Sequence, residues 1–183
     1  FIDLKQVNYK WSENTDQSMN LAFNKDMADD RKEWLRNYNR ENIIDAASKE
    51  IDFTGFINKD LIHFSNYDLS RSIPSLCDGM KTSQRKILYS CFKRNLKSEV
   101  KVAQLAGYIS EHSAYHHGEM SLHGTMIGMA QDYVGSNNIN LLEPKGQFGT
   151  RIQNGKDSAS ERYIFTQLSP LTRYIYRKED DYI

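Results

Sequence analysis

The clearest hydrophobic pattern lies between residues 83 and 133 and predicts three consecutive helices. In the first, Ile87, Leu88, Cys91 and Phe92 recur at helical spacing with basic side chains on the other face, and Asn95 is a stop signal. The second is expected over residues 100–113. The third has an apolar stripe that ends before residue 135 and is formed by Leu122, Met126, Met129, Ala130 and Tyr133.

A glycine-rich region follows these helices and ends in a β-prone run, Arg162 to Thr166. The residues that interrupt it are Gly135, Pro144, Gly146, Gly149 and Gly155. Helices followed by a glycine-rich hairpin are the element order of a winged helix-turn-helix, in which the third helix can enter the major groove and the wing can lie on phosphates. We therefore expect an α+β fold with such a domain.

The N-terminal part has a weaker pattern. It predicts a short strand over residues 7–11, a polar turn and a helix over residues 19–35. Residues 36–55 are rich in Asn and poorly patterned, which indicates a linker with a domain boundary near Ile51. The expected organisation is one domain with its linker over residues 1–50 and a second domain over residues 51–183.

Charge is informative through its distribution, because the 183-residue chain has 24 basic and 24 acidic residues and no net charge. Between residues 81 and 101, seven bases and the single acid Glu99 leave a charge of +6 over 21 residues. This density suits contact with a polyanion such as nucleic acid, although a solvated helix face gives the same pattern. No apolar stretch approaches the ~18 residues of a membrane span, so we expect no membrane association.

The cysteines and the chain ends bear on compartment and completeness. Cys77 and Cys91 fit neither a zinc spacing nor a disulfide framework, which favours a reducing compartment, the cytosol or nucleus. The chain starts at Phe1 and ends after an acidic run. We therefore expect it to be part of a longer protein.

Two candidate ligand sites fail on their spacing. His112, His116, His117 and His123 cluster in sequence, but the HExxH order and a nearby cysteine are missing, so no metal ligand is assigned. The His116-His117 pair could direct an imidazole at a phosphate or could be structural. Residues 149–156 differ from a nucleotide-binding P-loop in glycine spacing, and an acid follows Lys156 where the P-loop has Ser or Thr.

The segment around Tyr163 offers a different chemistry. A phenol is a weak nucleophile at neutral pH, so its attack on phosphorus needs a base or a metal-bound water and a cation to stabilise the added charge. Arg162 could be that cation. The pair alone is also compatible with an ordinary core tyrosine in a strand.

A longer set of motifs resembles the DNA-cleaving core of eukaryotic and viral type II DNA topoisomerases. The motifs occur in the family's order between residues 53 and 178, with Leu21-Ala-Phe and Asp30-Arg-Lys-Glu-Trp-Leu resembling the end of its Toprim domain upstream. The principal ones are Phe56-Ile-Asn-Lys-Asp-Leu-Ile, Arg71-Ser-Ile-Pro-Ser, Asp78-Gly-Met-Lys, Gln84-Arg-Lys, Cys91-Phe-Lys-Arg-Asn, Val100-Lys-Val-Ala-Gln-Leu-Ala-Gly, Tyr115-His-His-Gly-Glu, Val134-Gly-Ser-Asn-Asn, Gly146-Gln-Phe-Gly-Thr-Arg and the Arg162-Tyr163 segment.

The resemblance implies a winged helix-turn-helix domain preceded by the C-terminal part of a Toprim domain. It implies that Tyr163 attacks a DNA phosphodiester and is joined to the 5′ phosphate, that Arg162 stabilises the transition state, and that His117 contacts the scissile phosphate. The DNA-binding residues that it implies are Arg31, Lys32, Arg71, Lys81, Arg85, Lys86, Tyr115, His116 and Ser121.

The resemblance also implies partners and cofactors. The parent would be an ATP-dependent enzyme that passes one duplex through another, acts as a homodimer on double-stranded DNA, and is nuclear, or cytoplasmic if viral. Mg²⁺ and ATP would bind outside this chain, so we predict no metal ligand within it and no cleavage by the fragment alone. The alternatives are a non-catalytic winged-helix DNA-binding protein and a protein-interaction domain without a DNA role.

Three positions depart from the family pattern. The stretch between Leu35 and Phe56 is shorter and less basic than usual, Glu161 replaces a small residue or proline, and His123-Gly124 replaces a pair of methionines. The carboxylate of Glu161, beside Arg162, is expected to weaken that arginine's hold on a phosphate.

Overall fold

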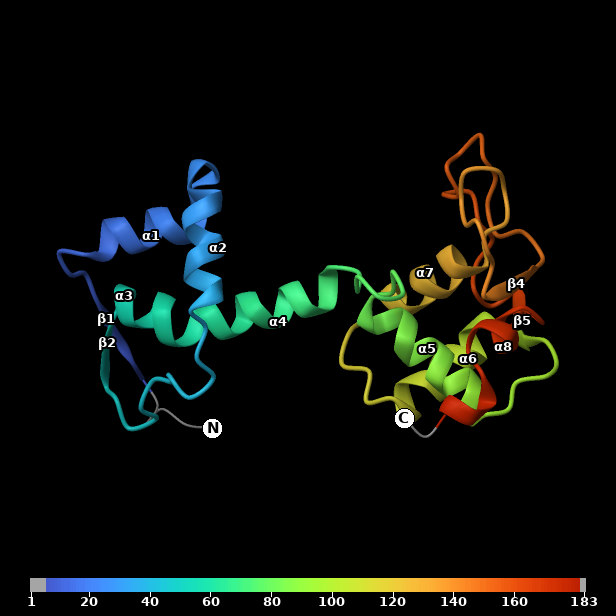
Figure 1. Cartoon of the computed structure of the whole chain (residues 1–183), viewed down its shortest axis with the longest axis horizontal. Helices are drawn as coiled ribbons and strands as arrows, with labels where there is room; N and C mark the ends of the chain where they lie inside the picture. The colour runs from blue at the N-terminus through green and yellow to red at the C-terminus, as the bar shows by residue number, and fades with distance from the viewer. Residues whose placement is uncertain (1–5, 182–183) are drawn as a thin grey trace. The chain divides into compact units, whose positions relative to one another are not determined.

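The computed structural model describes residues 6–181 and divides into two compact units, residues 1–73 and 74–183 (Figure 1). The division falls after Ile73 and not near Ile51, where the sequence pattern had placed it. The reason is that residues 50–52 form a strand that pairs with the N-terminal strand of the same unit, a long-range contact that local patterning does not reveal.

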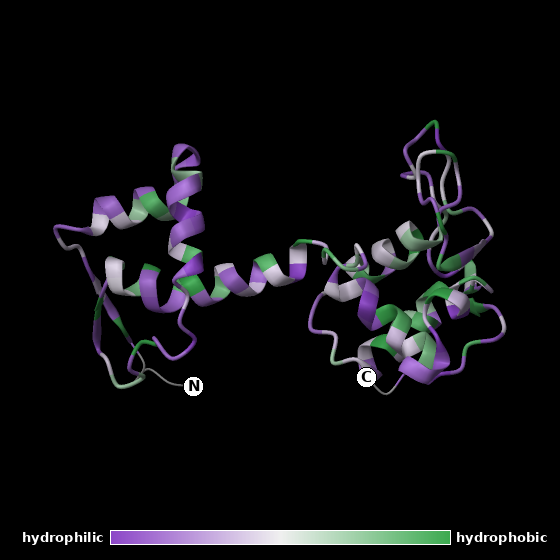
Figure 2. Cartoon of the chain, in the orientation of Figure 1, coloured by the Kyte–Doolittle hydropathy of each residue, from purple (hydrophilic) through white to green (hydrophobic). Residues whose placement is uncertain are grey.

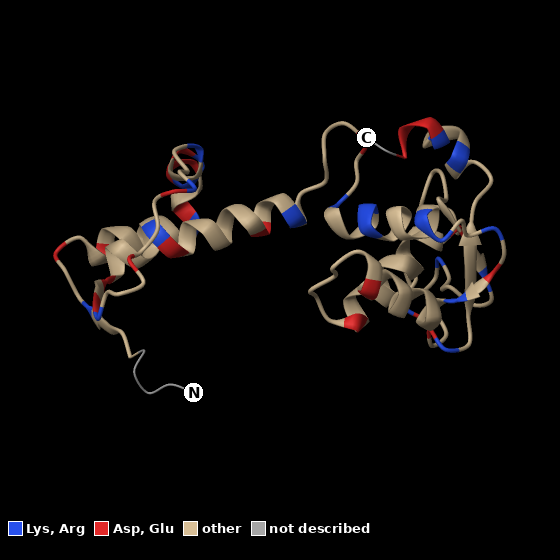
Figure 3. Cartoon of the chain, turned by 90° about the horizontal axis from the view of Figure 1, so that it is seen from below, with Lys and Arg blue, Asp and Glu red and all other residues tan. Residues whose placement is uncertain are grey.

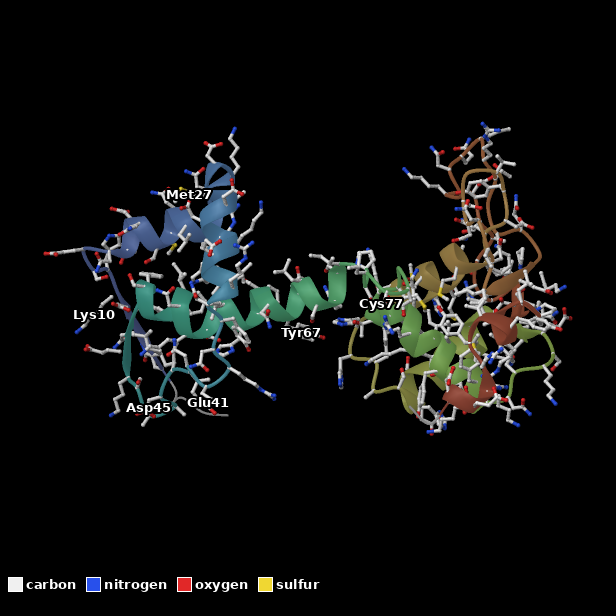
Figure 4. All side chains as sticks on the ribbon, in the orientation of Figure 1. Lys10, Met27, Glu41, Asp45, Tyr67 and Cys77 are labelled. Atoms are coloured by element: carbon white, nitrogen blue, oxygen red, sulfur yellow. The ribbon has the colours of Figure 1, made fainter. Side chains whose placement is uncertain are left out.

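The first unit is built on two short parallel strands and a long helical segment. Strand β1 (Asn8–Lys10) pairs with β2 (Glu50–Asp52), and Lys10, labelled in Figure 4, forms an ion pair across them with Glu50. The segment after β2 comprises α3 (Phe53–Phe56), a π-helical turn η2 (Ile57–Leu61) and α4 (Ile62–Ser72). Ile57 and Ile62 are buried in it.

The single helix expected over residues 19–35 is interrupted. The structure has α1 (Thr15–Phe23), a 3-10 turn η1 (Lys25–Met27) and α2 (Ala28–Arg36). The break occurs because the Asn24 side chain accepts a hydrogen bond from the Asp26 amide, which favours a turn over a continued helix. Helix α2 is mostly hydrophilic (Figure 2) and has no buried residue.

Of the stretch expected to be a linker, residues 37–49 form an irregular connection anchored to α4, whereas residues 50–55 belong to β2 and α3. Glu41 and Asp45 lie in this loop (Figure 4). His63 of α4 holds the connection at both ring nitrogens, with the Tyr38 hydroxyl 3.0 Å from Nδ1 and the Asn42 carbonyl oxygen 3.0 Å from Nε2. The loop is therefore part of the first unit.

The second unit contains the three predicted helices, α5 (Thr82–Lys93), α6 (Val102–His112) and α7 (Glu119–Ala130). Asn95 has a positive φ of 51° just after α5, which agrees with the predicted stop. Helix α6 starts two residues later than expected because Val100–Lys101 forms strand β3, and α7 starts and ends three residues earlier. Hydrophobic residues are concentrated where these helices pack (Figure 2).

A three-stranded antiparallel sheet completes the second unit. Its order is β3, β5 (Phe165–Leu168), β4 (Leu142–Lys145), and Thr166 of β5 lies opposite both Val100 and Pro144. Short helices α8 (Thr172–Ile175) and η3 (Lys178–Asp180) follow. Three helices and this sheet form a winged helix-turn-helix, so the predicted α+β fold is confirmed.

The wing is the connection between β4 and β5. It needs glycine at residue 149, where φ is +107° and an added Cβ would lie 2.6 Å from the backbone of Gly155. The side chain of Gln131 donates to the carbonyls of Phe148 and Gly155, which ties the wing to the end of α7. Within residues 6–181, no helix has the length and apolar content that crossing a membrane requires.

Candidate functional site

Tyr163 lies at the surface of the second unit. Its side chain is 74% exposed, so the phenol is not part of the core, and Arg162 beside it is also exposed. The strand expected from residue 162 starts at Phe165, and residues 161–163 form a turn in which the Tyr163 amide donates to the Ser160 carbonyl at 2.9 Å. This turn presents both side chains to solvent.

The turn is held firmly although its side chains are exposed. The Ala103 amide donates to the Glu161 carbonyl at 3.2 Å and the Val102 amide to the Ile164 carbonyl at 3.1 Å, so the first residues of α6 bracket the Arg162-Tyr163 pair. Ile164 is 1% exposed and anchors the next position in the core. A reactive group fixed by a rigid scaffold in this way is suited to catalysis.

Glu161 places a negative charge beside the pair. Its own backbone amide lowers the pKa of the carboxyl below the usual range, assisted by the nearby charges of His123 and Arg162 and a hydrogen bond from Ser160. The carboxylate is therefore ionised at neutral pH. A phosphate approaching Arg162 has to compete with it.

The histidine-rich segment forms the turn between α6 and α7, the helix-turn-helix. His116 is exposed and His117 half-buried, and the ring of His117 meets that of Tyr115 edge-on with centroids 5.5 Å apart. The Tyr115 hydroxyl lies 3.5 Å from the Ser121 hydroxyl in the first turn of α7. Tyr115, His117 and Ser121 therefore come together at the N-terminus of α7, where backbone amides favour an anion.

Helix α5 has basic residues along its length and no acid (Figure 3). Lys81, at its N-cap, is exposed, whereas Arg85 forms an ion pair with Asp78 at 2.6 Å. The ammonium of Lys86 donates to the Ala114 carbonyl at 2.7 Å. Of these three predicted DNA-binding side chains, two therefore have partners within the chain.

The predicted basic residues of the first unit also have internal partners. Arg31 donates to the carbonyls of Leu21 and Asn24 at the end of α1, and Lys32 pairs with Asp29 at 2.6 Å. Arg71 lies 3.1 Å from Asp68. The Lys32 and Arg71 pairs are solvent-accessible and individually weak, so a phosphate could replace the carboxylate at little cost.

The second unit has a basic cavity that residue spacing alone did not indicate. It has a volume of about 320 Å³ and lies between the end of α5, β3 and β5. The basic residues around the cavity lie within the +6 stretch of residues 81–101. The fold places them around one depression with a single acid, Glu99. The cationic side chains that line it are Arg94, Lys97 and Lys101.

Comparisons with known proteins identify the family to which the chain is similar. Residues 71–183 match the family model for the A-type subunit of DNA gyrase/topoisomerase IV, and residues 1–69 match the C-terminal associated domain of TOPRIM. The chain is 53% identical over 184 residues to the probable DNA topoisomerase 2 of Dictyostelium discoideum, and 60% identical over 163 residues to DNA topoisomerase 2 of Saccharomyces cerevisiae. These matches cover 99% and 89% of the chain, but 12% and 11% of the relatives.

A solved structure has a similar fold. The DNA-binding, cleavage and re-ligation domain of Plasmodium falciparum topoisomerase II superposes with a TM-score of 0.80 at 53% identity, covering 94% of this chain and 24% of that one. With a family model matched over residues 71–183, and a Toprim-associated segment before it, the chain belongs to the type II DNA topoisomerases.

Proposed function

We propose that this chain supplies the DNA-cleaving tyrosine of a type II DNA topoisomerase, and that this tyrosine is Tyr163. The observation that carries the proposal is the 74% exposure of Tyr163 on a turn bracketed by backbone hydrogen bonds from the start of α6. Arg162 is adjacent and also exposed. The match to a cleavage and re-ligation domain supports the assignment.

The reaction is a transesterification at phosphorus. The Tyr163 oxygen forms a bond to the 5′ phosphate as the bond to the 3′ oxygen breaks; the phenol gives up one proton and the 3′ oxygen takes one up. Arg162 stabilises the charge on the phosphoryl oxygens, and His117 contacts the same phosphate. Attack by the 3′ hydroxyl on the phosphotyrosine reverses the step and rejoins the strand.

Duplex DNA is the substrate in this proposal. The N-terminus of α7, and Lys81 and Arg85 at the start of α5, provide phosphate contacts, and phosphate contacts position a duplex without reading its sequence. Lys81, Arg85, Tyr115, His116 and Ser121 contribute from the second unit. Lys32 and Arg71 contribute from the first unit once a phosphate displaces their carboxylate partners. Arg31 donates to two backbone carbonyls, so its place among the proposed contacts rests on the sequence resemblance alone.

Magnesium and ATP belong to other parts of the parent protein in this proposal. Among residues 6–181, no group of three or more His, Cys, Asp or Glu side chains could hold a metal ion, so the residues present do not fit a magnesium site. We therefore assign no step to the metal within this chain. The proposed parent is a nuclear homodimer in which two such chains cut opposite strands.

Substitution of the tyrosine tests the proposal directly. In the full-length protein, Tyr163→Phe should abolish covalent protein–DNA adducts and leave DNA binding intact. Tyr174→Phe is the matched control, because Tyr174 is 81% exposed in the same unit and has no proposed role in the chemistry. If Tyr163→Phe still formed adducts, the assignment would be wrong and the non-catalytic DNA-binding alternative would gain support.

The isolated chain provides a second test. It should bind duplex DNA with an affinity that falls steeply with salt, but form no adduct even with added magnesium. An adduct at Tyr163 would contradict the assignment of the metal site to another part of the protein. Binding insensitive to salt would contradict the phosphate-contact model.

A further inference from the structure

Lys86 is directed at the protein backbone. It lies on α5 and is half-buried; its ammonium donates to the Ala114 carbonyl at 2.7 Å and lies 6.0 Å from the centroid of the Tyr115 ring. A charged donor to a carbonyl makes a strong hydrogen bond. The contact joins α5 to the turn between α6 and α7.

The carbonyl that Lys86 contacts belongs to a strained residue. Ala114 has a φ of +47°, a left-handed conformation that is uncommon for residues other than glycine. It follows the end of α6, where the Ser113 hydroxyl already donates to the Ile109 carbonyl at 2.7 Å. A cation is also favoured at a helix C-terminus by the helix dipole. Lys86 thus stabilises the point at which the chain reverses direction.

The reversal at Ala114 determines where the following residues lie. Tyr115 lies between the Lys86 ammonium, 6.0 Å from its ring centroid, and the Ser121 hydroxyl, 3.5 Å from its own hydroxyl, and the His117 ring packs edge-on against Tyr115. A shift of the Ala114 carbonyl would therefore move His117. A displacement of about 1 Å at a catalytic group can lower a rate by on the order of 100-fold.

We propose that Lys86 is a positioning residue, which holds the Ala114 carbonyl and thereby places His117 for the cleavage step, and not a direct DNA-phosphate ligand. The inference rests on the proposed function, because His117 acts on phosphate only in that reaction. It changes the role that the sequence resemblance implied for Lys86. Lys81, at the N-cap of the same helix, provides the comparison, because its side chain is exposed and forms no ion pair within residues 6–181.

The salt dependence of DNA binding separates the two roles. A lysine that binds a phosphate contributes about 0.9 to the slope of log K against log salt, whereas a positioning lysine contributes nothing. In the full-length enzyme with a duplex oligonucleotide, Lys81→Met should lower the magnitude of the slope by about 1.8, because the proposed homodimer presents two copies of the lysine to one duplex, and Lys86→Met should leave the slope unchanged. A decrease of about 1.8 in Lys86→Met overturns the inference, whatever the cleavage rate.

Cleavage at saturating DNA is the second readout. Lys86→Met should slow single-turnover adduct formation by roughly 10- to 100-fold, as expected for loss of a supporting contact, while Lys86→Arg, which keeps a charged donor, should restore most of the rate. An unchanged cleavage rate in Lys86→Met overturns the inference. If both variants have the melting temperature of the parent and Lys86→Arg does not restore the rate, the inference is also overturned. The Tyr163→Phe variant, run alongside, reports separately on the proposed function.

Discussion

His123 is expected to lower the stability of the second unit, and its replacement by methionine should raise it. The side chain is 9% exposed on α7, between core residues, and neither ring nitrogen has a hydrogen-bond partner within the described part of the chain. The nearest acid is Glu119, whose oxygen lies 3.6 Å from Nε2. Methionine is unbranched, fills irregular space and has a higher helix propensity than histidine.

The size of the effect follows from these contacts. A buried polar group without a partner costs about 1–3 kcal/mol, which His123→Met removes. The lost contact with Glu119 offsets at most about 1 kcal/mol, because that carboxylate is 65% exposed. The net gain should lie between about 0 and 3 kcal/mol and centre on about 1–2 kcal/mol, equivalent to roughly 5 °C or more in the melting temperature of a unit of this size.

Urea and thermal unfolding of the isolated chain at pH 8 provide the assay. His116→Met is the matched control, since it removes an exposed imidazole and should change the stability by less than about 0.5 kcal/mol. A His123→Met variant no more stable than the parent would refute the reasoning. It would mean that the ring nitrogens are satisfied, for example by a buried water.

Three further predictions concern other positions. Gly107→Ala should stabilise the chain by about 0.5–1 kcal/mol in urea unfolding, because an added Cβ in α6 meets no atom within 4 Å; destabilisation would contradict this. Hydrogen bonds from the Thr150 amide and hydroxyl lower the pKa of Asp157. Their contribution to folding stability is therefore present at pH values above the unfolded-state pKa near 3.8, and it is lost as the pH falls through the folded-state pKa. The amide of Thr150 should therefore exchange faster, relative to its intrinsic rate, below about pH 4. The Asp157→Asn variant should show the same faster exchange at neutral pH. Glu161→Ala in the full-length enzyme should speed cleavage a few-fold by removing the negative charge beside Arg162, and an unchanged single-turnover rate would count against it.

Local pattern predicted the helices of the second unit because each has an apolar face of its own. The positive φ at Asn95 shows that even the stop of α5 was encoded locally. The features that the local pattern did not predict depend on contacts between residues that are distant in sequence. Val100 and Lys101 form a strand and not the start of α6 because they pair with Thr166 and Phe165.

The same distinction between local pattern and distant contacts applies to the candidate site. Exposure of Tyr163 agrees with a surface role for the phenol, which the resemblance had implied. The partners of the basic residues could not be predicted, because residue type does not reveal that Arg85 faces Asp78 or that Lys86 reaches Ala114. The domain boundary was misplaced for the same reason, since the pairing of β1 with β2 links positions more than 40 residues apart.

The position of Tyr163 directly before β5 has a mechanical consequence. If a DNA strand is joined to the phenolic oxygen, tension on that strand is transmitted through Ile164 into β5, which has a neighbour on each side. Antiparallel ladder bonds lie perpendicular to the strands, so a pull along β5 loads several of them together in shear. While the break is open, the broken end would thus be tethered to the sheet at its central strand, which shares hydrogen bonds with both neighbouring strands.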